Sequence, residues 1–279
     1  MLAMSSILGE PVPSRRRPLR GFSVVTQAHL LSFANRRYRG SLSRIRSEAK
    51  AMKRFASIHA IDERSLGPDY WQQHGETVRR HRRGYGLWTW KPYAIRRHLE
   101  QLPTGDMLVY SDAGCSLNAE GRSRLEEYVT LAAGHPTGVL AFTLDGLVGQ
   151  WTKRATLAAF HADDPAMRAR EMVAATALVF RAGPETLDLV REWEERMRNV
   201  SLIDDSPSSQ GEHPEFRGHR HDQSIFTLLA HERELQRIPD ETWFGGEWDG
   251  FRQFPIHARR WRHSLPWSQA WMRRGLWRV

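Results

Sequence analysis

The sequence feature that most constrains the fold is a short apolar run that ends directly before an acid. Met107–Tyr110 has the length and composition of a strand buried on both faces of a sheet, and Asp112 and Gly114 follow it. A helix is predicted just before this strand, over residues 92–102, because a proline suits the first helical turn and apolar residues recur at helical spacing. A helix leading into a fully buried strand is typical of an α/β fold.

The residues around this strand predict a ligand site. In open α/β sheets, ligands bind outside the carboxyl ends of the strands. Asp112 in that position suits a ribose hydroxyl or a metal-bound phosphate, and Gly114 would let a ligand approach the backbone. Lys91, at the start of the predicted helix, opposes the helix dipole, which an anion such as a diphosphate would explain. The alternative interpretation is a turn acid and a surface lysine.

Length and composition are those of an ordinary globular protein. The chain has 279 residues, with 40% hydrophobic and 26% charged residues, enough for one large α/β domain or two small ones. Its single cysteine, Cys115, excludes an internal disulfide framework and fits a reducing, cytoplasmic environment. No apolar run approaches the roughly 18 residues of a membrane-spanning helix, so none is expected.

The net charge of +9 is compatible with three kinds of partner: nucleic acid, an anionic membrane surface or a phosphorylated substrate. The sequence has no zinc-finger spacing, no RNP-like aromatic pattern and no basic heptad region, so a nucleic-acid partner is not expected. Peripheral contact with the inner face of a membrane would use the same positive charge.

Composition divides the chain into three parts: a disordered basic arm over residues 1–20, a folded domain over 21–260, and a basic Trp- and Arg-rich tail over 261–279. The first strand of the domain is predicted at Phe22–Thr26. Thr26 would then lie at its carboxyl end, a normal place to hold a nucleotide base.

Two further stretches have clear expected structures. Gly84–Lys91 is predicted to be a glycine- and aromatic-rich loop, and Met172–Phe180 a central strand.

A long irregular segment over 201–218 leads to Asp222 and Gln223 at the start of another helix. These two residues are either a helix cap or an acid and an amide directed into the cleft.

Aromatic and basic residues suggest two other sites. Trp151 beside Lys153 could form an acceptor-binding platform, because sugar faces stack on aromatic rings, although ordinary packing explains the pair slightly better. Near the C-terminus, His257 could close a metal or diphosphate site, or belong to a basic, aromatic surface flap.

Four motifs taken together resemble a group of bacterial GT-A-type glycosyltransferases found among cell-surface polysaccharide enzymes. They are GYGLWTWKPY at 84–93, YSDAGC at 110–115, WTK at 151–153 and HRHDQS at 219–224. The resemblance covers about residues 22–260. It implies a GT-A-like, Rossmann-type mixed sheet flanked by helices, and transfer of a sugar from a nucleotide-diphosphate sugar donor to a hydroxyl of a glycan or lipid-linked acceptor.

The same resemblance assigns a donor site. Asp112 matches the first acid of the D-x-D element that holds ribose or metal, but Gly114 stands where a second acid would be, so one metal carboxylate is missing. A divalent cation, Mn²⁺ or Mg²⁺, is therefore a possible cofactor, held by Asp112 with His257 as the late histidine of the metal site. Lys91 resembles the basic residue that heads the helix before the D-x-D strand.

Asp222 and Gln223 resemble the D-Q pair that lies beside the donor sugar in related retaining enzymes, and are the expected catalytic residues. The competing hypothesis is a non-catalytic basic protein that binds an anionic membrane or polymer through its Arg- and Trp-rich end. A transferase would lose turnover on Asp112→Ala and Asp222→Ala. A binding module would tolerate Asp112→Ala and lose binding as salt is added.

Overall fold

A computed structural model describes residues 26–260 of the chain. The arm expected over 1–20, the tail expected over 261–279 and most of the strand expected at Phe22–Thr26 lie outside the described residues. The first described strand is β1, Ala28–Phe33, which begins after Thr26.

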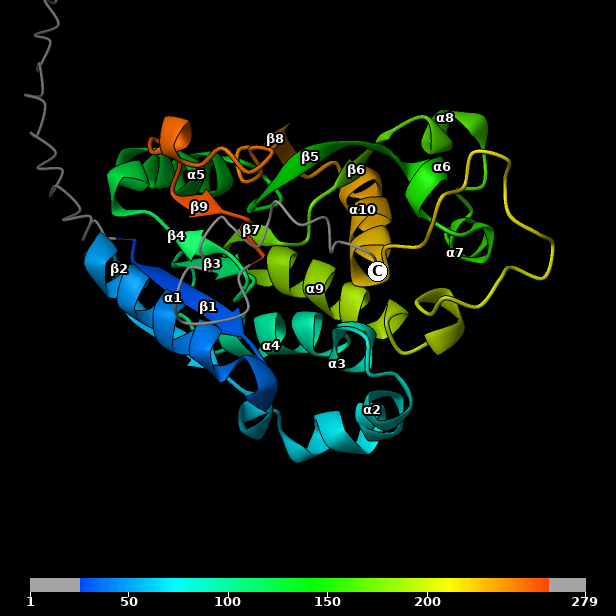
Figure 1. The fold of residues 1–279 in the computed structure, drawn as a ribbon, viewed down its shortest axis with the longest axis horizontal. Helices are drawn as coiled ribbons and strands as arrows, with labels where there is room; N and C mark the ends of the chain where they lie inside the picture. Colours follow the sequence, from blue (N-terminus) through cyan, green and yellow to red (C-terminus); the bar gives the residue numbers. More distant parts are fainter. Residues whose placement is uncertain (1–25, 261–279) are drawn as a thin grey trace, which may run out of the picture.

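Seven strands form one mixed sheet in the order β2-β1-β3-β7-β5-β6, with β8 paired to β5 (Figure 1). The remaining bounds are β2 Phe55–Ile61, β3 Met107–Ser111, β5 Val139–Leu147, β6 Glu171–Val173, β7 Ala177–Arg181 and β8 Gln236–Pro239. β1 is parallel to β2 and β3, β8 is parallel to β5, and β7 is antiparallel to both β3 and β5. The carboxyl ends of β1, β3, β5 and β8 therefore lie along one edge of the sheet.

Helices cover both faces of this sheet. The longer ones are α1 Arg39–Met52, α2 Pro68–Arg80, α4 Trp90–Leu99, α5 Arg122–Gly134, α9 Pro184–Arg196 and α10 Asp222–Glu232. Leu108 and Tyr110 of β3 belong to the core shared with α4, α9 and α10, whereas Met107 and Val109 belong to the core shared with α1 and α5. The expected α/β fold class, a mixed sheet flanked by helices, is confirmed.

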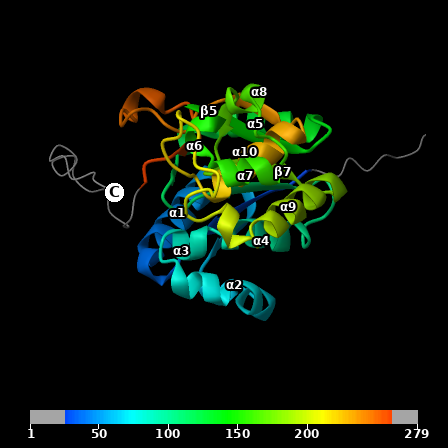
Figure 2. The same ribbon diagram turned by 90° about the vertical axis from the view of Figure 1, so that its right-hand side faces the viewer.

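Shorter elements complete the chain. They are α3 Gly84–Leu87, α6 Val148–Trp151, α7 Arg154–Ala159, α8 Pro165–Arg168 and a small sheet of β4 Ser116–Leu117 with β9 Ile256–His257. Figure 2 shows α2 at one extreme of the molecule, below α3 and α4. Between residues 26 and 260, no helix has both the length and the apolar character that crossing a bilayer would need.

The single strand expected over Met172–Phe180 is wrong, because the backbone leaves the strand at residues 174–176 and divides it into β6 and β7. The break turns two carbonyl groups toward the carboxyl edge of the sheet. Thr176 O accepts a hydrogen bond from Asp112 N at 2.9 Å, and Ala175 O accepts one from Lys91 Nζ at 3.0 Å. An apolar pattern cannot reveal this break, since Ala174 and Ala175 are as buried as strand residues.

Candidate active site

Three charged side chains meet at the carboxyl edge of the sheet. Lys91 comes from the first turn of α4, Asp112 follows β3, and Asp222 is the first residue of α10. Lys91 Nζ lies 2.6 Å from Asp222 Oδ2 and 3.5 Å from Asp112 Oδ1. The structure thus brings together three of the residues that the sequence assigned to the donor and catalytic sites.

Burial sets the charges of this cluster. Burial by itself lowers the pKa of Lys91, but the carboxylates of Asp112 and Asp222 more than offset it and the pKa is raised, so the ammonium stays charged. Burial raises the pKa of Asp222 to about 6, against the opposing effect of Lys91. Near neutral pH the cluster therefore consists of one ammonium between two carboxylates, with Asp222 close to its titration range.

Asp222 is more than a helix cap. The N-cap residue of α10 is His221, and the buried Asp222 carboxylate contacts Lys91 of α4. Asp112 is held differently, because its Oδ1 accepts a hydrogen bond from the Tyr110 hydroxyl at 2.5 Å while the side chain stays 30% exposed. Asp112 is therefore the member of the cluster that a ligand can reach.

One wall of the cleft is a strained turn, where the sequence predicted an ordinary loop. All five residues from Gly84 to Trp88 have positive φ, between 53° and 86°. For residues other than glycine this conformation costs about 1–2 kcal/mol each. Hydrogen bonds hold the turn, including Trp90 Nε1 to Gly84 O at 2.9 Å. The turn places the Trp88 ring on the ring of His221, with centroids 5.1 Å apart.

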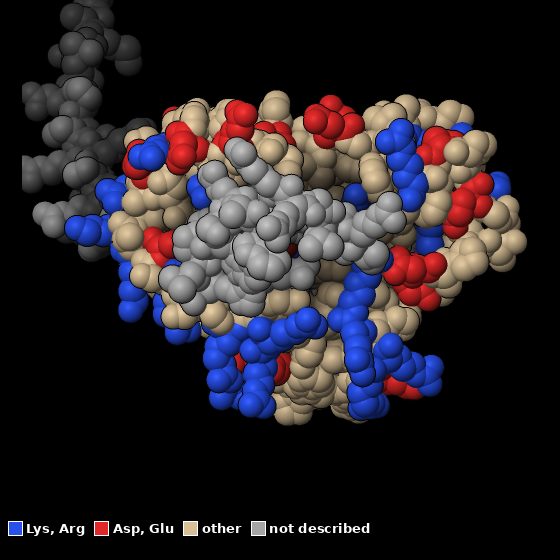
Figure 3. Space-filling model, in the orientation of Figure 1, with Lys and Arg blue, Asp and Glu red and all other residues tan. Residues whose placement is uncertain are grey.

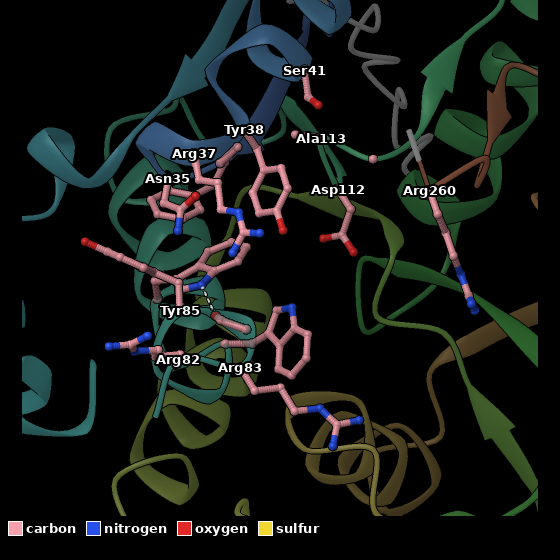
Figure 4. Close-up of a pocket in the computed structure, with 16 residues that line it drawn as sticks. Asn35, Arg37, Tyr38, Ser41, Arg82, Arg83, Tyr85, Asp112, Ala113 and Arg260 are labelled. Carbon is pink, nitrogen blue, oxygen red and sulfur yellow. Dashed lines mark hydrogen bonds between the residues drawn. The ribbon is translucent and has the colours of Figure 1, made fainter. Parts of the chain in front are cut away.

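Two cavities meet at Asp112 and Gly114, and both residues line each of them. The first has a volume of about 480 Å³ and lies between the carboxyl end of β1, the start of α1 and the strained turn (Figure 4). The second has a volume of about 520 Å³ and lies beside the ends of β5 and β8. Arg260 also lines both cavities.

The second cavity contains two of the predicted residues, Gln223 and Trp151. Gly146 of β5 lets the Trp151 ring lie against the strand, because a Cβ atom there would be 2.5 Å from Trp151 Nε1. The Arg220 guanidinium covers the ring, 4.0 Å from a ring centroid. The second cavity thus has an aromatic and a polar wall beside the charged cluster.

Lys153 lines neither cavity, although its predicted acceptor-binding role would place it there. Its side chain is buried, and Nζ donates to Asp204 Oδ1 at 2.7 Å and to the carbonyls of Asp204 and Ser206 at 3.1 and 3.2 Å. These contacts anchor the irregular segment after α9. The WTK motif therefore divides between a residue in the cleft and a structural one.

Thr26 is also misplaced by the sequence prediction. β1 runs parallel to β3 with Ala28 opposite Met107, so Thr26 lies at the amino edge of the sheet and Asp112 at the carboxyl edge. The error arose because the strand begins two residues after Thr26 instead of ending there.

His257 is not directed toward Asp112. Its ring lies in β9, Nε2 is 3.1 Å from Phe251 O and Nδ1 is 3.4 Å from Arg259 Nη2, and it lines neither cavity. In the described part of the chain, no group of three or more His, Cys, Asp or Glu side chains could hold a metal ion. Around Lys91, only Asp112 offers a partly exposed carboxylate, and it lies 3.5 Å from the ammonium, which is a poor donor set for a protein-held Mn²⁺ or Mg²⁺.

Sequence reasoning missed several residues of the cleft. They are Asn35, Tyr38, Asp145, Arg220, Asp240 and Trp243, whereas Arg260 belongs to the basic flap expected around His257. Of the missed residues, only Arg220 carries a signal that could have found it, since it stands inside the HRHDQS motif. The others follow strands or short turns whose ends the sequence does not define.

No protein-family model matches the chain, and no curated protein matches it. Similar solved structures include a glycosyltransferase involved in the glycosylation of the major capsid of PBCV-1, with 10% identity, a TM-score of 0.45 and coverage of 85% of this chain and 96% of that one. Mouse xyloside xylosyltransferase 1 has 14% identity, a TM-score of 0.43 and coverage of 86% of this chain and 100% of that one. The galactosyltransferase LgtC has 11% identity, a TM-score of 0.46 and coverage of 82% and 86%. With TM-scores below 0.5, these likenesses decide nothing about activity, and the residues of the cleft must do so.

Proposed function

We propose that this protein is a glycosyltransferase that moves a sugar from a nucleoside-diphosphate sugar to a hydroxyl of a glycan or lipid-linked acceptor. The observation that carries the proposal is that Asp112, which lines both cavities, is joined to the buried pair of Lys91 and Asp222 directly behind it. Transfer needs two ligands that meet at one point, and the cleft has two adjoining spaces with Asp112 between them.

The first cavity suits the nucleotide. Asn35 follows β1, and its Oδ1 is buried with no hydrogen-bond partner within residues 26–260, so a donor group of a ligand would satisfy it. The Tyr38 ring lies at the same end of the cavity (Figure 4) and could stack on a base. Asp112 would then accept hydrogen bonds from ribose or sugar hydroxyls, since its side chain remains partly exposed.

The second cavity suits the acceptor. Trp151 and Trp243 line it, and aromatic faces bind the apolar faces of sugars. Asp145 and Asp240 lie on the same wall, where carboxylates accept hydrogen bonds from hydroxyl groups. A glycan acceptor in surface polysaccharide synthesis is the substrate class we propose for this space.

Asp222 and Gln223 would act on the donor sugar. As the bond to the diphosphate weakens, positive charge develops at the anomeric carbon, and the Asp222 carboxylate, which is buried and lines neither cavity, would stabilise that charge from behind Asp112. Lys91 keeps Asp222 ionised and oriented through its 2.6 Å contact. Gln223, one residue further along α10, faces the second cavity and would position the sugar against the acceptor.

A thermal-shift screen tests the proposal. The full chain is mixed with UDP, GDP, CDP or ADP, each with Mn²⁺, Mg²⁺ or EDTA, because a ligand that binds the folded state raises the melting temperature. A shift with one nucleoside diphosphate, reduced in Asp112→Asn, is the expected result. If none of the four shifts the melting temperature in any condition, the transferase proposal fails and the non-catalytic basic protein of the sequence analysis takes its place.

The Arg- and Trp-rich end on which that alternative depends lies largely outside the described residues, but Figure 3 shows a further basic surface, where Lys and Arg side chains gather on the lower part of the face, over α1, α2 and α3. Binding of anionic vesicles that weakens steeply with salt, without any nucleotide effect, would be its signature.

A further inference from the structure

Three arginines from distant parts of the sequence converge on the junction of the two cavities. Arg83 precedes α3 and lines the first cavity, Arg220 precedes α10 and lines the second, and Arg260 follows β9 and lines both. In Figure 4, Arg83 lies below Asp112 and Arg260 lies to its right. None of the mechanistic steps above uses these guanidinium groups.

The protein positions these arginines but leaves most of their charge unpaired. Arg220 lies on Trp151 at 4.0 Å, and Arg260 lies 5.4 Å from the centre of a Trp243 ring. Within residues 26–260, only Arg83 of the three forms an ion pair with a carboxylate, to Asp205 at 3.0 Å. Stacking on indole rings fixes the planes of the other two and leaves their N–H groups free for a ligand.

The three groups are close enough to repel one another. Burial lowers the pKa of Arg220, and the charges of Arg260 and Arg83 lower it further. Within residues 26–260, Arg220 and Arg260 form no ion pair with a carboxylate, and cations held close together destabilise a protein unless an anion binds between them. Guanidinium groups pair with phosphate oxygens through two parallel N–H donors, which makes phosphate the anion that fits best.

By comparison, the site offers few ligands for a divalent cation. Asp112 is the acid nearest the donor cavity, its Oδ1 is engaged by the Tyr110 hydroxyl, and the Lys91 ammonium is 3.5 Å away. Gly114 has no side chain to add a second carboxylate. A divalent cation would therefore meet a protein cation and a single available oxygen.

We infer that Arg83, Arg220 and Arg260 bind the donor diphosphate in the place that a divalent metal would take, so that this chain binds and uses its donor without metal. The inference rests on the proposed transferase function. During transfer the bond between the anomeric carbon and the β-phosphate oxygen breaks, and its electron pair stays on the diphosphate. A bond forms between that carbon and the acceptor oxygen, whose proton passes to the diphosphate and then to solvent. The arginines stabilise the charge that grows on the leaving diphosphate.

Isothermal titration of the full chain tests the inference, using the nucleoside diphosphate that gives the thermal shift and its monophosphate, each in EDTA and in Mn²⁺. The expected result is a diphosphate Kd that changes less than threefold between EDTA and Mn²⁺. Arg220→Gln and Arg260→Gln should each weaken the diphosphate at least tenfold and the monophosphate much less. Arg191→Gln, an exposed arginine of α9 far along the chain from the cleft, is the matched control and should change neither.

Two outcomes would overturn the inference while leaving the transferase proposal intact. One is binding that requires Mn²⁺ or Mg²⁺ and disappears in EDTA. The other is metal-free binding that both arginine variants retain in full. Failure of every nucleoside diphosphate to bind, with metal or without, would instead contradict the proposed function itself.

Discussion

Lys91 and Lys153 are both buried lysines inside motifs that the sequence assigned to ligand binding, yet their surroundings differ. The ammonium of Lys153 donates to carbonyl and carboxylate oxygens of Asp204 and to the carbonyl of Ser206, all in one irregular segment. The ammonium of Lys91 contacts one carbonyl, of Ala175, and two carboxylates from separate elements, Asp112 and Asp222. Only the second arrangement borders a cavity, through Asp112.

This difference shows that burial alone does not identify a catalytic lysine. Lys153 satisfies its donors within a loop that it fixes in place, which is a structural task. Lys91 joins three elements of the fold at the carboxyl edge of the sheet and fixes the charges of two acids there. The following experiments test that contrast, beginning with the largest expected effect.

Lys91→Met should remove activity and weaken the fold. The variant leaves the buried Asp222 carboxylate without its cation, which costs about 3–5 kcal/mol of unfolding free energy, and it disorders the charged cluster, which should lower kcat at least 100-fold. Urea unfolding and release of nucleoside diphosphate from the donor sugar measure the two effects. Wild-type turnover in this variant would show that Lys91 has no role in catalysis.

Lys153→Met should lower the stability of the fold and leave most of the activity. Asp204 is partly exposed, so water can hydrate its carboxylate when the lysine is removed. The substitution should therefore cost about 1.5–3 kcal/mol of unfolding free energy. Turnover per folded molecule should fall less than tenfold, because the residue does not touch the cleft. A drop in kcat as large as that of Lys91→Met, with little loss of stability, would erase the distinction between the two lysines.

The contributions of Asp222 and Asp204 to the stability of the fold should change in opposite directions as the pH falls. Burial raises the pKa of Asp222 to about 6, so its protonation favours the folded state and its contribution to stability grows as the pH falls from 7 toward 4. Burial also acts on Asp204, but hydrogen bonds from Lys153 and Ser206 outweigh it and lower the pKa, so its contribution is lost only below about pH 4.

The pH dependence of kcat tests the ionisation of Asp222 independently of stability. If the Asp222 carboxylate is required, kcat should fall about tenfold per pH unit below pH 6, since only the ionised form is active. A profile of kcat from pH 5 to 8 measures this limb, and Asp222→Asn should lack it. A flat profile across that range would show that Asp222 is not the ionised group on which turnover depends.

The smallest effect is expected at Gly146. A Cβ atom there would meet Trp151 Nε1 at 2.5 Å and displace the indole that lines the second cavity. Gly146→Ala should raise the KM for the acceptor several-fold, with the donor Kd unchanged, as steady-state kinetics would show. Gly105→Ala is not a suitable control, because φ there is 96°. Gly134→Ala is suitable, since no atom lies within 4 Å of its Cβ position and Gly134 lines neither cavity.

The fold class and the central three residues of the site were predictable from sequence. Met107–Tyr110 is apolar enough to require cover on both faces, and an acid that follows such a strand must lie at a carboxyl edge. Lys91 and Asp222 were found through motifs, although nothing in the sequence indicated that they form an ion pair with each other.

The errors have physical causes. Thr26 was misplaced because strand boundaries depend on pairing with β2 and β3, which the sequence does not display. Lys153 was misassigned because a lysine that anchors a loop and one that serves a ligand have the same local pattern. The left-handed turn at Gly84–Trp88 is opposed by local propensity, since three of its residues are not glycine, and it is held by the hydrogen bond from Trp90 to Gly84 and by the stacking of Trp88 on His221.

The central claim is that the cluster of Lys91, Asp112 and Asp222 activates a nucleoside-diphosphate sugar. The most direct test is release of nucleoside diphosphate from a panel of UDP-, GDP-, CDP- and ADP-sugars by the full chain, with and without a glycan acceptor. The account predicts release from one donor class, at least 100-fold slower in Asp222→Asn although that variant unfolds cooperatively and still binds the nucleotide. Release from no donor, or equal release by wild type and Asp222→Asn, would contradict it.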